Sequence, residues 1–354
     1  MKKAIIAALG LAAGAGAHAQ TNVTLYGIVD AAFVGENGGA AGHRTKISSG
    51  AASASRIGFR GGEELGDGMS AFFTLETGVR IDTGEVDAAG TIFNRQALVG
   101  LKTKAGAVAL GRQYTPYHLT LTAVGDPFGT GYAGTAKNLF PDNGTNVRAS
   151  NAVTYVSPTV EGTHVELFYS AGEQSVVSAG RQFGGALDYG HGPLRVRLAY
   201  NSRNTDVAAA GTSHDLGRNT LLAANYDLHW ATLYAAYGID KGTGSAPLAN
   251  ASNPYGGVKP TPSTDGRDLL LGFKAPAGPG TLMVSVQHKD DRTRFNQDAT
   301  SWGIGYLLAL SKRTGLYAAY AHIDNKNGAG YTVANNSESG SGNTGYNLGI
   351  RHAF

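Results

Sequence analysis

The chain repeats one pattern, in which apolar residues alternate with polar or small residues. Residues 22–33 show it first, with Val23, Leu25 and Phe33 on one side of the alternation and Thr24 and Asp30 on the other. A period of two is the side-chain repeat of a β-strand that has one apolar face. The sequence therefore predicts an all-β fold. Similar stretches follow at residues 69–80, 153–158, 164–171, 194–200, 220–228, 267–275, 281–288, 301–310 and 315–323.

The connections between these stretches come in two alternating sizes. Residues 102–106 and 190–193 are short and turn-like, whereas roughly residues 35–54, 114–147 and 325–344 are long and polar. Alternating turn and loop lengths indicate an up-and-down antiparallel sheet whose two chain ends lie on the short-turn side. We count about sixteen strands, and about 10 residues per strand is the length that a tilted strand needs to cross a bilayer.

The last nine residues, YNLGIRHAF, keep the alternation up to the terminal Phe354. Chain ends usually fray, so a final strand that persists to its last residue requires a pairing partner. A sheet of this size must also split, curl or close to protect its edges. Pairing of the last strand with the first satisfies both needs, and the sequence predicts a closed barrel.

The polar side of the alternation carries charges, and these charges indicate which face of the sheet lines the inside of the barrel. Arg195 and Arg197 lie in a single strand, and a dry protein core does not tolerate such a pair. Aromatic residues such as Tyr26, Trp230 and Trp302 recur near strand ends, as in an interfacial girdle. The pattern favours a transmembrane barrel with lipid outside and a polar lumen inside.

The first nineteen residues combine Lys2 and Lys3 with an apolar stretch and a small-residue end at Ala17-His18-Ala19. This is the pattern of a cleaved secretory signal peptide, residues 1–19, and it leaves residues 20–354 as one barrel domain. The formal net charge of +3 falls to +1 without the two lysines, which excludes a general affinity for nucleic acid. The chain has no cysteine, so neither disulfides nor Cys-ligated metals stabilise it.

Several stretches resemble the trimeric general-diffusion porins of the Gram-negative outer membrane, especially their beta-proteobacterial branch. They are TLYGIVDAAF near the mature start, SRIGFRGGEELGDGMSAFFTLETG (55–78), FNRQALVGLKTKAGAVALGRQYTP (93–116), NAVTYVSP (151–158) and the closing GIRHAF. The resemblance implies a sixteen-stranded antiparallel barrel with short periplasmic turns and long extracellular loops. It also implies homotrimers embedded among outer-membrane lipid and lipopolysaccharide.

The same resemblance implies passive diffusion of small hydrophilic solutes and inorganic ions past a third loop, residues 114–147, that folds into the pore. The terminal Phe354 resembles the signal that is read by the barrel assembly machinery. Loops of this length in compact proteins are usually functional. In the family the third loop carries acids that face arginines on the barrel wall, and here its acids are Asp126 and Asp142.

Strand parity selects the arginines of the wall. Arg56 and Arg60 fall on the lumenal side, opposite Ile57 and Phe59, and Arg148 falls opposite Val153 in the same way. Arg80 shares the lumenal parity of Glu76. Simple alternation groups Arg95 with outward apolar residues, but the resemblance places an arginine of the constriction there, which requires a bulge or a strand-end position. The candidate pore constriction comprises Arg56, Arg60, Arg80, Arg95, Arg148, Asp126 and Asp142.

Opposed charges across a narrow, water-filled gap orient dipolar solutes and set ion preference. Because the basic residues concentrate at the candidate constriction, we expect a mild preference for anions. Arg112 has the outward parity, where a charge facing lipid at mid-depth costs about 2–4 kcal/mol. It either contacts a neighbouring subunit, as the resemblance implies for a trimer in which the second loop with Glu85 latches onto the next subunit, or reaches the headgroups from a strand end.

Other motifs carry little weight. GTGYAG, residues 129–134, has the spelling of a dinucleotide fingerprint but follows no parallel strand. The histidines show no pair at metal-ligand spacing on one strand face. We therefore expect no cofactor, no metal and no catalytic residues. The alternatives to a general channel are a substrate-specific channel, an outer-membrane enzyme and an adhesin.

Overall fold

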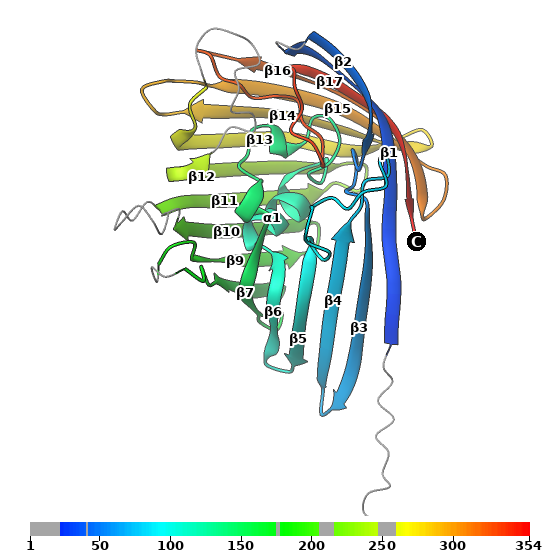
Figure 1. Ribbon diagram of the computed structural model, residues 1–354, viewed down its shortest axis with the longest axis vertical. Helices are drawn as coiled ribbons and strands as arrows, with labels where there is room; N and C mark the ends of the chain where they lie inside the picture. The colour runs from blue at the N-terminus through cyan, green and yellow to red at the C-terminus, as the bar shows by residue number, and fades with distance from the viewer. Residues whose placement is uncertain (1–21, 40–41, 175–177, 205–215, 247–259) are drawn as a thin grey trace, which may run out of the picture.

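The computed structural model describes residues 22–39, 42–174, 178–204, 216–246 and 260–354 (Figure 1). The predicted signal peptide, residues 1–19, lies outside them. The described part contains seventeen strand segments joined in one sheet. Their bounds are β1 Asn22–Gly39, β2 Gly42–Ser49, β3 Arg56–Gly66, β4 Met69–Gly78, β5 Gln96–Thr103, β6 Gly106–Tyr114, β7 Arg148–Val156, β8 Thr163–Ser170, β9 Gln182–His191, β10 Leu194–Asn204, β11 Leu216–Asp227, β12 Thr232–Ala246, β13 Ser263–Ala277, β14 Gly280–Asp291, β15 Ala299–Ala309, β16 Thr314–Asn325 and β17 Thr344–Ala353.

These segments form a closed antiparallel barrel of sixteen strands, as the sequence predicts. The two counts agree because β2 and β3 together occupy one strand position. β2 pairs with the second half of β1, whereas β3 pairs with its first half. Residues 50–55 separate the two pieces and bend away from the ladder.

The barrel closes where β17 pairs with β1, in a register that runs from Ile28↔Ala353 to Asn37↔Thr344. The terminal residue takes part in this seam. Phe354 donates its backbone N–H to the carbonyl oxygen of Gly27 at 3.1 Å, and Gly27 donates its N–H to the Phe354 carbonyl oxygen at 3.1 Å. The alternation persists to the last residue because that residue completes the ladder.

The outer face of the barrel is apolar and the inner face is polar. In β10, Leu198 is 44% exposed, whereas the neighbouring Arg197 is 5% exposed. Aromatic side chains such as Tyr189, Trp230 and Trp302 are also exposed on the outside. This arrangement confirms the predicted orientation, with lipid outside and a charged lumen inside. No helix in the described ranges is long and apolar enough to cross a membrane.

The connections differ from the expected ones in one region. The sequence predicts a long loop over residues 35–54, but β1 continues to Gly39 and β2 returns as far as Ser49. The pairing of Glu36 with Arg44 and of Val34 with Lys46 keeps this extension in register. Strand pairing extends the hairpin beyond the apolar alternation, because backbone hydrogen bonds do not require apolar side chains.

Candidate pore constriction

The long connection between β6 and β7 lies inside the barrel. It contains a short helix α1, Pro116–Thr120, a π-helical turn, Leu121–Gly125, and 3-10 turns at Ala136–Asn138 and Gly144–Asn146. Figure 1 shows α1 on the concave side of the curved sheet. We refer to residues 115–147 as the inner loop.

Apolar packing holds the first half of the inner loop against the barrel wall. Tyr117, Leu121 and Val124 are fully buried, and they form one apolar cluster with Leu221 of β11 and Leu270 of β13. A fully buried side chain of this size contributes about 1.5–3 kcal/mol relative to an exposed one. The loop is therefore a packed layer of the lumen.

Hydrogen bonds from the wall fix the loop backbone at several further points. The Gln287 amide donates to the carbonyl oxygens of Gly134, at 2.9 Å, and of Thr135, at 3.1 Å. Asn225 donates to the carbonyl oxygen of Val124 at 3.2 Å. These donors come from β14 and β11, so the loop is attached to both strands.

Asp126 organises the tip of the inner loop. Its carboxylate accepts backbone N–H groups from Phe128 at 2.9 Å, Thr130 at 2.8 Å and Ala136 at 2.9 Å, and the residue is 1% exposed. Burial raises the pKa of Asp126 above its ordinary value, although these three donors oppose the shift. Its oxygens bind the loop's own backbone and do not contact the arginines of the wall.

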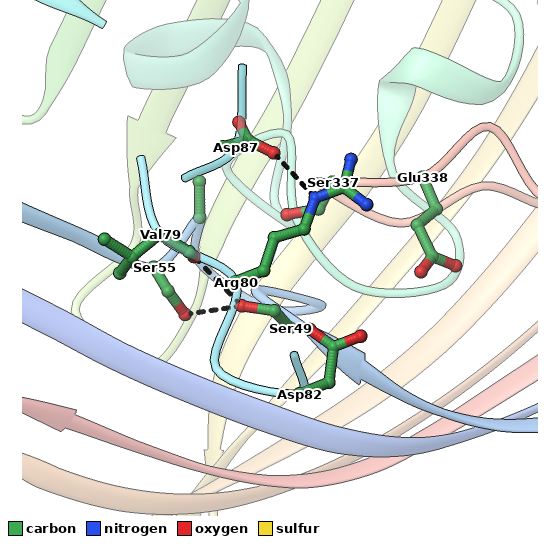
Figure 2. A pocket seen from close by; sticks show the side chains of 9 residues that line it. Ser49, Ser55, Val79, Arg80, Asp82, Asp87, Ser337 and Glu338 are labelled. Atoms are coloured by element: carbon green, nitrogen blue, oxygen red, sulfur yellow. Dashed lines mark hydrogen bonds and ion pairs between the residues drawn. The ribbon is translucent and has the colours of Figure 1, made fainter. Parts of the chain in front are cut away.

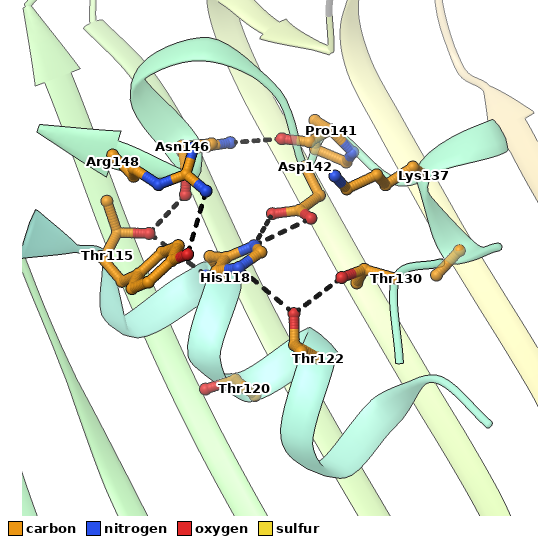
Figure 3. A network of polar contacts seen from close by, with 12 residues as sticks. Thr115, His118, Thr120, Thr122, Thr130, Lys137, Pro141, Asp142, Asn146 and Arg148 are labelled. Carbon is orange, nitrogen blue, oxygen red and sulfur yellow. Dashed lines mark hydrogen bonds and ion pairs between the residues drawn. The ribbon is translucent and has the colours of Figure 1, made fainter. Parts of the chain in front are cut away.

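Asp142, the second acid of the loop, pairs with His118 of α1 (Figure 3). The Nδ1 atom of His118 donates to the carboxylate at 2.9 Å, because a carboxylate at neutral pH can only accept. The pKa of His118 is lowered, chiefly by burial and also by Lys137 and Arg148, although Asp142 opposes the shift. Although burial alone would raise the pKa of Asp142, His118, Lys137 and Arg148 lower it overall.

Three arginines of the wall form one cluster, and two of them bind Glu76 of β4. Arg95 Nε lies 2.7 Å from Glu76 Oε1, and Arg56 Nε lies 3.4 Å from Glu76 Oε2. Tyr26 donates its hydroxyl to the same carboxylate at 3.0 Å. The third arginine, Arg148, is joined to Arg95 through a phenol: both donate from Nη2 to the Tyr114 hydroxyl, at 3.0 Å and 2.7 Å.

The structure shows how Arg95 reaches this cluster despite its outward parity in the sequence. Arg95 precedes the first residue of β5, and its backbone N–H bonds the carbonyl oxygen of Glu76 at 3.1 Å. Arg148 begins β7, where a register shift opposite Gly111 and Gln113 interrupts the alternation. The alternation of side chains that starts at Val153 therefore does not continue unbroken to Arg148. The position of Arg148 follows instead from its strand pairing with Tyr114.

The remaining candidates lie outside this cluster. Arg60 stacks over the Tyr26 ring at 5.2 Å to its centroid. Arg80 lies beyond the end of β4, half exposed, with Nε 3.7 Å from Asp87. Figure 2 shows Arg80 and Asp87 lining a small pocket together with Ser337 and Glu338 of the last loop.

Arg112 lies at the end of β6 with partners in its own chain. Its Nε donates to the Asn94 carbonyl oxygen, and its Nη1 donates to the Ser150 hydroxyl at 2.9 Å. Glu85 is exposed and accepts a hydrogen bond from Thr83 at 3.2 Å. The two residues do not contact each other within the described chain.

A cavity of about 560 Å³ lies beside the arginine cluster, between the inner loop and the last loop. Four cationic side chains and three acids line it. The cations are Arg95, Arg112, Lys137 and Arg148, and the acids are Asp87, Asp142 and Glu338. Lys137 also donates to the carbonyl oxygen of Asn336 at 3.2 Å.

Sequence reasoning did not single out the side chains of Glu76, Tyr114, His118 or Lys137, although the last three lie in the predicted third loop, residues 114–147. Glu76 has lumenal parity, and Tyr114 lies in the GRQYTP stretch that carries the resemblance. These two signals identify the region but not the contacts. Among the described residues, no group of three or more His, Cys, Asp or Glu side chains is arranged to hold a metal ion.

Comparison with known proteins agrees with this fold. Residues 4–328 match the model of a family described as Gram-negative porin. The chain is 34% identical to outer membrane porin protein 32 of Delftia acidovorans and 30% identical to an outer membrane porin protein of Bordetella pertussis, in each case over the whole of both chains. Among solved structures, it is similar to the anion-selective porin from Comamonas acidovorans. That similarity has a TM-score of 0.78 and 30% identity, and it covers 95% of this chain and 100% of the other.

Proposed function

The chain belongs to the Gram-negative porin family and forms a passive diffusion channel across the outer membrane, and we propose that this channel prefers anions. Family membership sets aside the enzyme alternative, because the family and the similar proteins are channels. Small hydrophilic solutes and inorganic ions are the proposed cargo.

One observation carries the proposed anion preference. Two guanidinium groups, those of Arg56 and Arg95, share the single carboxylate of Glu76. A third, that of Arg148, is joined to Arg95 through the Tyr114 hydroxyl and has no ion pair of its own among the described residues. In a narrow aqueous passage the net fixed charge raises the local concentration of the opposite ion. The similar Comamonas acidovorans protein, which is described as anion-selective, supports the same assignment.

The proposal divides the candidate residues by role. Arg56, Arg95 and Arg148 form the basic side of the constriction, and residues 114–147 narrow the pore beside them. Arg60 and Arg80 add positive charge along the path. Asp142 carries negative charge next to Lys137, and Asp126 acts through the shape of the loop.

Planar-bilayer recording tests this proposal. The reversal potential of the purified protein in a salt gradient should have the anionic sign, and Arg148→Gln should move it toward zero. Arg195→Gln is the matched control, because Arg195 is also lumenal but is paired with Asp188 at 2.9 Å. A cationic sign in the unmodified protein would refute the anion preference and leave the channel function in place. Block of the current by one solute in a saturable manner would instead favour a substrate-specific channel.

We propose the homotrimer as the functional assembly, with Glu85 and Arg112 at the contact between subunits. Glu85 is exposed on the second loop, and Arg112 is partly exposed and has the outward parity of β6, although it also lines the cavity beside the arginine cluster. Arg112→Ala combined with Glu85→Ala should release monomers in an unheated detergent gel. Unchanged trimers would place the contact elsewhere.

We also propose that the barrel assembly machinery reads Phe354, and that lipid and lipopolysaccharide surround the folded barrel. The Phe354 side chain is exposed at the closing seam. Phe354→Ala should reduce the amount of protein in the outer membrane more than it reduces refolding in detergent. Equal losses in both assays would assign Phe354 to stability alone.

A further inference from the structure

The phenol of Tyr114 occupies the position between Arg95 and Arg148 where a carboxylate would ordinarily bind arginines. A guanidinium offers five N–H donors, and buried arginines usually satisfy them with acids, which also cancel their charge. Arg95 has such an acid in Glu76, but between Arg95 and Arg148 one neutral oxygen accepts from Arg95 Nη2 at 2.7 Å and from Arg148 Nη2 at 3.0 Å.

Two contacts fix the orientation of the Tyr114 ring. On one side it stacks on the His118 imidazole, with centroids 4.9 Å apart and planes inclined by 16°. The Arg148 guanidinium carbon lies 4.5 Å from the ring centroid, within the range of a cation–π contact. His118 is held in turn by Asp142, so the inner loop positions the phenol.

Within the described residues, Arg148 has no direct ion-pair partner, although Asp142 lines the same cavity. Its buried Nε atom has no hydrogen-bond partner in that part of the chain. Arg95 and Lys137 line the same cavity. Arg95 is paired with Glu76 on its other side, but the neutral phenol that joins Arg95 to Arg148 adds no negative charge beside Arg148.

From these contacts we propose that Tyr114 is the positioning residue for the anion preference of the pore. Its hydroxyl gathers Arg95 and Arg148 at the constriction without adding a negative charge between them. The inference rests on the proposed anion preference. It goes further because it proposes that a neutral residue, Tyr114, which does not itself attract ions, sets the preference by positioning the arginines.

The test compares the reversal potentials of Tyr114→Phe and Tyr114→Leu. Tyr114→Phe keeps the ring and its stacking but removes the acceptor, so the reversal potential should shift toward zero nearly as far as in Tyr114→Leu. If Tyr114→Phe leaves it unchanged and only Tyr114→Leu shifts it, the ring and not the hydroxyl is responsible, and the proposal fails. Tyr155→Phe is the control, because the Tyr155 hydroxyl bonds Ala105 at a short turn.

A second measurement shows whether Tyr114 acts through the arginines. In an Arg95→Gln/Arg148→Gln background, the additional change Tyr114→Phe should no longer shift the reversal potential. A shift of the same size as in the unmodified background would overturn the proposal.

Two outcomes distinguish failure of this proposal from failure of the anion preference. A cationic reversal potential in the unmodified protein would refute the anion preference itself. Anion selectivity that is normal and unaffected by Tyr114→Phe would refute only the role of Tyr114. Should Tyr114→Phe form no channels, Tyr114→Trp, which also retains a ring without an acceptor at that oxygen, replaces it in both comparisons.

Discussion

Glu76 and Arg95 form a buried ion pair at the pore wall, with Arg95 Nε 2.7 Å from Glu76 Oε1 and side chains that are 3% and 6% exposed. Glu76 also accepts a hydrogen bond from Tyr26 and lies 3.4 Å from Arg56. It is thus the acid that holds the two arginines to the wall.

Replacement of this acid should have two opposite effects. Glu76→Gln should move the reversal potential further toward the anion limit, because one negative charge leaves the constriction. It should also destabilise the barrel, by up to about 3–5 kcal/mol, since it leaves buried charge unpaired. Bilayer recording and urea unfolding in micelles measure the two effects. Glu63→Gln, at an exposed site near the other end of the barrel, is the control. An unchanged reversal potential in Glu76→Gln would show that the charge of Glu76 does not contribute to the ion preference.

A second buried ion cluster joins β12, β13 and β14. Lys289 Nζ lies 2.9 Å from Asp240 and 2.7 Å from Asp268, and all three side chains are 1% exposed or less. Lys289→Met should lower the free energy of unfolding by about 3–5 kcal/mol, because it leaves two carboxylates buried together.

Unfolding by urea measures this loss against Lys241→Met. Lys241 pairs with Asp265 at 2.6 Å in a largely exposed position, so its loss should cost no more than about 1 kcal/mol. Equal effects of the two variants would contradict the role of burial.

The closing seam leaves no room for a side chain at position 27. A Cβ atom on Gly27 would lie 2.3 Å from Phe354 Cζ and 2.6 Å from the Arg56 carbonyl oxygen. Gly27→Ala should therefore lower the free energy of unfolding by about 1–3 kcal/mol. Gly190→Ala is the matched control, because nothing lies within 4 Å of the added atom. A loss no greater than in the control would show that the seam relaxes freely.

The inner loop should loosen in acid. The pKa of His118 is lowered by burial from 6.5, so the displaced loop binds more protons than the packed loop, and stability falls as the pH drops below about 6.5. The lowered pKa of Asp142 acts in the same direction at more acidic pH, because stability is lost as that carboxylate becomes protonated.

Open-channel noise between pH 7 and pH 5 measures this loosening. It should rise in the unmodified protein and change much less in His118→Gln, whose side chain carries no charge at any of these pH values. The same rise in both proteins would assign the effect to another group.

Much of the fold follows from local sequence. The alternation in residues 22–33 and in the terminal nine residues predicts strands and their outward faces, because side-chain direction in a strand depends only on parity. Parity also assigns Arg56 and Glu76 to the lumenal side. The same rule groups Arg95 with the outward residues, since it assumes an unbroken strand, and Arg95 lies just before β5 begins.

The acids of the inner loop show a second limit of prediction from sequence. Asp126 and Asp142 are identifiable as loop acids, but the sequence does not specify their partners. Asp126 binds the backbone of its own loop, and Asp142 binds His118, 24 residues earlier in the chain. Such contacts depend on the path of a loop without a repeating pattern.

By itself, then, the sequence determined a closed transmembrane barrel with a polar lumen, because a period of two and a paired terminal strand are properties of the chain read in order. Only the tertiary structure decided that Arg95 and Arg148 meet on Tyr114 and that Arg56 and Arg95 share Glu76. The physical reason is that these groups come from separate strand ends. Barrel closure, a register shift in β7 and the packed inner loop bring them together.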